Sequence, residues 1–79
     1  MSKYSSREEA LNQPGEIYTH YKGGVYRLLY RDVKHTETNE IGVVYEHLYP
    51  HENRIFFRPQ EMFFGLNDKG EQRFTPVDR

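Results

Sequence analysis

Residues 35–49, HTETNEIGVVYEHLY, join a polar segment to an apolar one. Positions 35–40 carry an imidazole, two hydroxyls, two carboxylates and an amide, whereas positions 41–49 are rich in β-branched and aromatic residues. Such a run is typical of a buried strand, and a polar loop leading into a rigid strand often forms a binding site. The stretch therefore predicts a strand over Ile41–Tyr49, buried on both faces, with a candidate site at its start.

Shorter runs of strand-forming residues lie on both sides of this strand and are separated by turn residues. Pro59 has no amide hydrogen, so strand pairing is expected to stop there. A single helical turn over Pro59–Met62 would return the chain to the core. The further strands expected are Ile17–Tyr21, Val25–Val33, Arg54–Arg58 and Gln72–Val77. Five to six short strands joined by tight turns predict a mainly β fold, a small SH3-like β-barrel.

Side-chain alternation along Val25–Val33 is expected to place Tyr26, Leu28 and Tyr30 on one face of the sheet. At the N-terminus, Ser6-Arg-Glu-Glu9 matches a capping box and predicts a short helix over Arg7–Asn12. Because so short a helix is marginal alone, residues 1–13 are either a docked flap or a frayed arm. Residues 14–79 are expected to form a single small β-barrel domain.

Composition narrows the class of protein. The 79 residues contain no cysteine, which excludes a disulfide framework and a thiolate zinc site. Seven Tyr and five Phe are more rings than so small a barrel easily buries, so some are expected to line a pocket or an interface. The net charge of −1 and the lack of a basic run give little support to nucleic-acid or membrane binding. Neither a membrane span nor a signal peptide is recognisable, so a cytoplasmic location is expected.

The loop His35–Glu40 is the first candidate site. In an extended segment, Glu37 would lie beside His35, while Thr36 and Thr38 would offer hydroxyls on the opposite side. Such a loop suits a ribose diol or a polar head group. The alternative is a loop whose Thr and Asn side chains satisfy its own backbone.

Arg58 is the second candidate, with Arg27 and Arg54 as possible allies. An arginine fork binds phosphate or carboxylate in a bidentate manner. The alternative is an internal ion pair that holds the loop to the barrel. Its expected partners are Glu37, Glu40 and Glu61.

Tyrosine and histidine side chains complete the candidate set. Tyrosines on adjacent strands either stack a base or belong to the core with a hydroxyl at the rim; they are Tyr18, Tyr21, Tyr26, Tyr45 and Tyr49. The histidines at 20, 35, 47 and 51 match no metal-binding spacing, so no metal site is expected. His20 and His35 are instead expected to meet across the sheet with Glu37.

No nucleophile elbow and no phosphate-cradling glycine loop is present, which disfavours an enzyme.

Four motifs occur in order between residues 17 and 64. They are Tyr18-x-His20-Tyr21-Lys22-Gly23-x-x-Tyr26, His35-Thr36-Glu37-Thr38-x-Glu40, Val44-Tyr45-x-x-Leu48-Tyr49 and Arg58-Pro59-x-x-Met62-Phe63. Their order and spacing resemble the DUF1653 family. The resemblance implies a compact β-barrel of bacterial or phage origin and assigns no function. The chain departs from the usual family pattern in its N-terminal extension and in Lys34.

The leading hypothesis is a non-enzymatic binding module that captures a nucleotide-like or ADP-ribose-like anion, without cofactor or metal. A phage protein that sequesters a host signal would be one such module. The expected partners are this ligand and a second copy of the chain in a homodimer. The alternatives are an SH3-like protein- or RNA-interaction module and a metal-dependent hydrolase. The predicted ligand-binding residues are His20, Tyr21, Tyr26, His35, Thr36, Glu37, Thr38, Tyr45 and Arg58.

Overall fold

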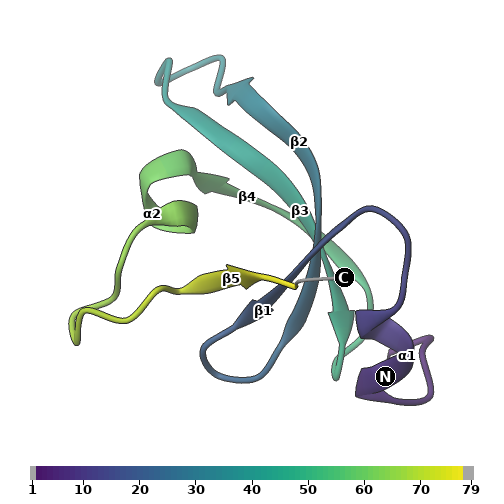
Figure 1. Ribbon diagram of the computed structural model, residues 1–79. Coiled ribbons are helices and arrows are strands. Elements are labelled where there is room, and N and C mark those ends of the chain that lie inside the picture. Colours follow the sequence, from purple (N-terminus) through teal and green to yellow (C-terminus); the bar gives the residue numbers. More distant parts are fainter. Residues whose placement is uncertain (1, 78–79) are drawn as a thin grey trace.

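Five antiparallel strands form one curved sheet in the computed structural model, which describes residues 2–77 (Figure 1). In chain order the elements are α1 (Arg7–Leu11), β1 (Glu16–His20), β2 (Val25–Lys34), β3 (Ile41–Tyr49), β4 (Arg54–Pro59), α2 (Gln60–Phe64) and β5 (Phe74–Pro76). The strand order across the sheet is β4-β3-β2-β1-β5. The mainly β class, the two short helices and the number of strands are as predicted from the sequence. None of the helices in residues 2–77 is long and apolar enough to cross a membrane.

Side chains, rather than backbone pairing, join the two edges of the sheet. Strands β4 and β5 are the edges, and no ladder connects them within residues 2–77. Helix α2 follows β4 and contributes Phe63, whose ring stacks on Phe74 of β5 at 4.2 Å between centroids. The Arg58 guanidinium of β4 lies over the same Phe74 ring at 5.5 Å. The predicted barrel is therefore incomplete, and its seam is packed by aromatic and cationic side chains.

Strand β2 corrects one prediction about side-chain direction. Its pairing with β3 shifts register between Leu28 and Tyr30, as at a β-bulge, so that Leu28 lies opposite Tyr45 and Tyr30 lies opposite Val44. An extra residue in a strand turns the following side chains to the other face. Leu28 is buried, whereas Tyr30 is 66% exposed. The prediction that Tyr30 shares a face with Tyr26 and Leu28 is therefore wrong.

Two apolar clusters stabilise the sheet. The concave side holds the larger one, formed by Tyr18, Leu28, Val43, Tyr45, Phe63 and Phe74. The other side holds Ala10, Ile17, Val25 and Leu48. Ala10 belongs to α1 and is fully buried, so this helix is docked on the sheet rather than frayed. Its first turn is capped at Ser6, whose hydroxyl accepts the Glu9 amide hydrogen at 3.1 Å. The return bond of a capping box is replaced, since the Glu9 carboxylate accepts from the Ser5 hydroxyl at 2.6 Å.

Candidate functional site

Strand pairing assembles the candidate site on the concave side of the sheet, toward the β1–β2 turn. Tyr26 of β2 lies opposite His47 of β3, and His47 lies opposite Arg54 of β4. Two residues along β3, Tyr45 lies opposite Phe56. Because paired residues in a sheet project to the same side, these five side chains face the same space.

Two hollows adjoin one another on this side. We call hollow A the space of about 280 Å³ lined by Tyr26, His47, His51, Glu52, Arg54 and Phe56. Hollow B has a volume of about 270 Å³ and is lined by His20, Lys22, Gly23, Gly24, Tyr26, His47, Tyr49, Pro50 and His51. Tyr26, His47 and His51 line both. Their shared wall is therefore made of one phenol ring and two imidazoles.

Tyr26 lies at the centre of this wall. Its ring packs edge-on against Tyr45 at 5.5 Å, His47 at 4.8 Å and Phe74 at 5.3 Å. Gly24 permits this placement, because a Cβ atom there would lie 2.8 Å from the Tyr26 ring. Burial raises the pKa of the Tyr26 hydroxyl, and Tyr45 adds to the effect. The hydroxyl thus stays protonated at neutral pH and can donate a hydrogen bond.

Positive charge surrounds His20 at the end of β1. Burial lowers the pKa of its imidazole, and Arg58, Lys22 and Arg73 lower it further. Nδ1 accepts the Lys22 amide hydrogen at 3.1 Å, so the neutral ring carries its proton on Nε2. A neutral donor among three cations is suited to an anion.

His47 is 6% exposed, and its Nε2 accepts the amide hydrogen of His51 at 3.1 Å. Burial lowers its pKa, and the nearby His51 lowers it further. Both conditions hold the ring in the neutral form. His47 therefore supplies an uncharged, rigid part of the wall between the hollows.

We expect the melting temperature to fall as the pH is lowered from about 7 to 5. The unfolded chain protonates His47 near the ordinary pKa of 6.5, whereas the folded protein resists protonation, so acid favours the unfolded state. His47→Gln keeps a hydrogen-bond acceptor and removes the titration. It should reduce the fall in melting temperature between pH 7 and 5, as measured by circular dichroism, and the remaining fall is due to His20, whose pKa is also lowered. His35→Gln is the matched control, and a pH response equal to wild type in H47Q would contradict this assignment.

Arg58 and Tyr45 line neither hollow but lie next to residues that do. The Arg58 Nε donates to the Tyr45 hydroxyl at 3.1 Å, and Tyr45 is buried in the larger cluster. No carboxylate of residues 2–77 forms an ion pair with Arg58, so the expected pairing with Glu37, Glu40 or Glu61 is not found. Arg54 lines hollow A, whereas Arg27 pairs with Glu46 on the other side of the sheet.

The polar loop lies at the other end of the sheet. Lys34 and Ile41 pair at the tip of the β2–β3 hairpin, eight residues along β2 from Tyr26 and on the order of 25 Å away. Figure 1 shows this tip pointing away from the β1–β2 turn. The structure therefore does not bring His35, Thr36, Glu37 and Thr38 together with the His20 and Tyr26 group.

Backbone amides of this loop bond to two of its side chains, His35 and Thr38. His35 Nδ1 accepts amide hydrogens from Glu37 at 3.2 Å and Thr38 at 3.4 Å. The Thr38 hydroxyl accepts from the Glu40 amide at 3.2 Å. This geometry is that of a loop which satisfies its own backbone.

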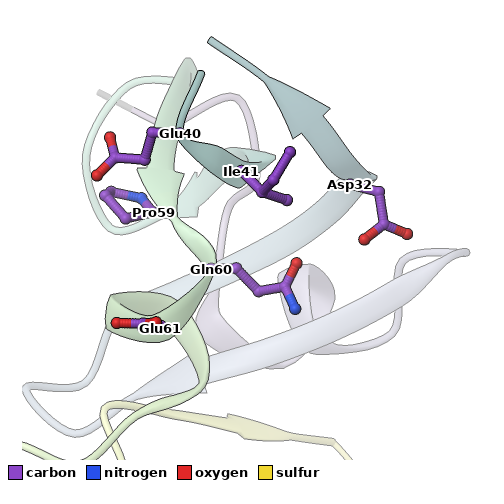
Figure 2. Close-up of a pocket in the computed structure, with 6 residues that line it drawn as sticks. All are labelled: Asp32, Glu40, Ile41, Pro59, Gln60 and Glu61. Atoms are coloured by element: carbon purple, nitrogen blue, oxygen red, sulfur yellow. The ribbon is translucent and has the colours of Figure 1, made fainter. Parts of the chain in front are cut away.

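A hollow of about 500 Å³ lies beside the hairpin tip and is lined by Asp32, Glu40, Ile41, Pro59, Gln60 and Glu61. Figure 2 shows the three carboxylates at separate corners of this hollow, with Ile41 and Gln60 between Asp32 and the two glutamates. Among residues 2–77, no group of three or more His, Asp or Glu side chains is placed to hold a metal ion. The acidic lining does not suit an anion.

Of the nine residues predicted to bind a ligand, His20 and Tyr26 line hollows A and B. Tyr45 and Arg58 lie next to the residues that line them. Tyr21 is exposed beside His20, with ring centroids 4.5 Å apart. Lining residues outside the predicted set include Lys22, His47, His51 and Phe56. Alternation along β3 and β4 places His47 and Phe56 on the Tyr45 side, and this signal was present in the sequence.

A family model described as "Protein of unknown function (DUF1653)" matches residues 16–76, or 61 of the 79 residues. The match spans β1 to β5 and leaves α1 outside it. Comparisons with curated proteins and with solved structures gave no significant match. The chain belongs to the DUF1653 family, as its four sequence motifs indicated.

Proposed function

We propose that this protein is a binding module for a small anion that carries an aromatic ring, a nucleotide being the simplest example. The observation that carries this proposal is the pairing of ring side chains and cations around hollows A and B. Phe56 is 40% exposed at the rim of hollow A, where a base can stack on it. Lys22 and the Nε2 of His20 in hollow B then meet the phosphate.

Local charge supports an anion although the whole chain has a net charge of −1. The groups that act on His20 are Arg58, Lys22 and Arg73, all positive. Glu52 is the one carboxylate that lines hollow A, and it pairs with Arg54 at 3.3 Å. Both side chains of this pair are mostly exposed, so the pair is weak, and the charge of Arg54 offsets that of Glu52 in hollow A. A nucleotide ligand would agree with a cytoplasmic location.

The test is calorimetric titration with adenosine monophosphate. Phe56→Ala and Lys22→Gln should each weaken binding about tenfold, as expected for loss of one stacked ring or one charge-assisted contact. Phe57→Ala and Lys34→Gln are matched controls, because Phe57 projects to the opposite side of β4 and Lys34 lies at the hairpin tip. Equal losses in a variant and its control would contradict the proposed site.

A second candidate is an interaction module for a protein, including another copy of this chain. Tyr30, Val44 and Phe57 lie opposite one another across β2, β3 and β4 on the outer side of the sheet. Tyr30, Phe57 and the neighbouring Ile55 are exposed. Exposed apolar rows of this kind occur at protein interfaces. Failure of the wild-type protein to bind adenosine monophosphate would favour this second function.

A further inference from the structure

A third hollow continues the proposed binding surface beyond hollow B. We call hollow C the space of about 310 Å³ lined by Tyr21, Lys22, Asn67, Asp68, Lys69 and Arg73. Hollows B and C share Lys22. The ring of His20, which lines hollow B, also packs against the ring of Tyr21, which lines hollow C, with centroids 4.5 Å apart. The three hollows thus follow one another from Phe56 past Tyr26 to Tyr21.

Hollow C repeats the pairing of ring and cation found in hollows A and B. Tyr21 is 46% exposed, and the Lys22 ammonium lies 5.7 Å from its ring centroid. Lys69 and Arg73 add two further cations against the single carboxylate of Asp68. The Tyr21 amide donates to the Arg73 carbonyl at 3.0 Å, which fixes this end of β1 against β5. A second ring can therefore stack at a defined place.

We propose that this surface binds two aromatic rings joined by a phosphate linkage, as in a dinucleotide. One ring stacks on Phe56, the other stacks on Tyr21, and the linking phosphate lies at Lys22 and His20 between them. Each hollow alone has about the volume of the smallest ligand pockets, roughly 300 Å³. A mononucleotide therefore fills only part of the surface. This inference rests on the proposed function and adds the class of ligand.

Two sources can supply such a ligand, a free dinucleotide or a segment of single-stranded RNA. Their shared chemistry is two bases with phosphate between them. Titration should compare adenosine monophosphate, the dinucleotide ApA with a 5′-phosphate, and a ten-residue oligoadenylate. We expect the dinucleotide to bind at least about tenfold more tightly than the mononucleotide, since a second base is stacked.

Tyr21→Ala separates this inference from the proposed function. The variant should bind the dinucleotide about tenfold more weakly and weaken mononucleotide binding by a smaller factor, since the Tyr21 ring packs against His20 and Lys22 but does not contact a base stacked on Phe56. Tyr30→Ala removes an exposed tyrosine from the opposite side and should change neither. Because Tyr21 lies outside both apolar clusters, the variant should fold, which a thermal melt will verify.

The outcomes are distinct. Equal affinity for the mononucleotide and the dinucleotide, or no effect of Y21A, overturns the two-ring inference and leaves the nucleotide site standing. No binding of either compound overturns both. The affinity of the oligoadenylate, corrected for its overlapping binding sites, identifies the source of the ligand. An affinity equal to that of the dinucleotide indicates a free dinucleotide, and a higher affinity indicates RNA. Both of these results support two-ring recognition.

Discussion

Phe74→Ala is expected to lower the free energy of unfolding by about 3–5 kcal/mol, the usual cost of deleting a buried phenylalanine ring. Phe74 is 1% exposed and is the residue through which β5 joins the larger apolar cluster. Its ring stacks on Phe63, packs against Tyr26 and lies below the Arg58 guanidinium. Its removal would open the seam between the two edges of the sheet.

Chemical denaturation followed by circular dichroism measures this effect. Small domains are stable by only about 5–15 kcal/mol, so F74A should be partly unfolded in mild denaturant. Phe56→Ala removes the same side chain from a half-exposed position and should cost about 1–2 kcal/mol. If the two variants lost the same stability, the seam would not depend on Phe74.

The strands were predictable because their signals are local. The β3 bounds, Ile41–Tyr49, match the prediction, since nearly every residue of this run favours a strand. The N-cap at Ser6 follows from hydrogen bonds within one turn of helix. Turn residues then marked the ends of β1, β2 and β4 to within a residue.

The closure of the sheet was not predictable in the same way. The seam depends on Phe63 and Phe74, which are distant in sequence and stack only because α2 and β5 cross the same space. The register shift near Tyr30 likewise results from the pairing of β2 with β3, and a period-two pattern cannot show it. Tyr30 therefore lies on the opposite side from that expected.

The candidate site could be predicted in part. Tyrosines on adjacent strands pointed to Tyr26 and Tyr45, and Arg58 was expected as an anion ligand. His20 was expected to meet His35 and Glu37, which lie at the other end of the sheet. The loop at residues 35–40 is ambiguous in the sequence because its side chains are the types that bind ligands and also the types that satisfy a turn. Its backbone hydrogens occupy His35 Nδ1 and the Thr38 hydroxyl. Which of the two roles applies depends on loop geometry that residue types do not specify.

Gly42 has an importance that the sequence does not reveal. It lies in β3 opposite Pro59, where a Cβ atom would be 2.4 Å from the Arg58 carbonyl oxygen and 2.5 Å from the Phe57 ring. Real Cβ atoms essentially never approach so closely. The missing side chain therefore allows the Phe57 ring to cover β3 and the end of β4 to lie close to it.

Gly42→Ala is expected to lower the free energy of unfolding by about 1–3 kcal/mol, the usual cost of overpacking. The methyl group would push β4 away from β3 at Arg58, since a backbone oxygen cannot swing aside as a side chain can. Movement of Arg58 would also disturb its bond to the Tyr45 hydroxyl and the charge around His20. Weaker nucleotide binding should therefore accompany the loss of stability.

The double variant G42A/F57A tests whether crowding is the cause. Removal of the Phe57 ring relieves one of the two close approaches and leaves the Arg58 carbonyl in place. The double variant should therefore lose less stability than the sum of the two single losses, by an interaction energy of about 0.5–3 kcal/mol in a denaturation cycle. Strict additivity would mean that the alanine methyl never meets the ring. The close packing of β4 on β3, which holds Arg58 and Phe56 beside the hollows, would then need another explanation.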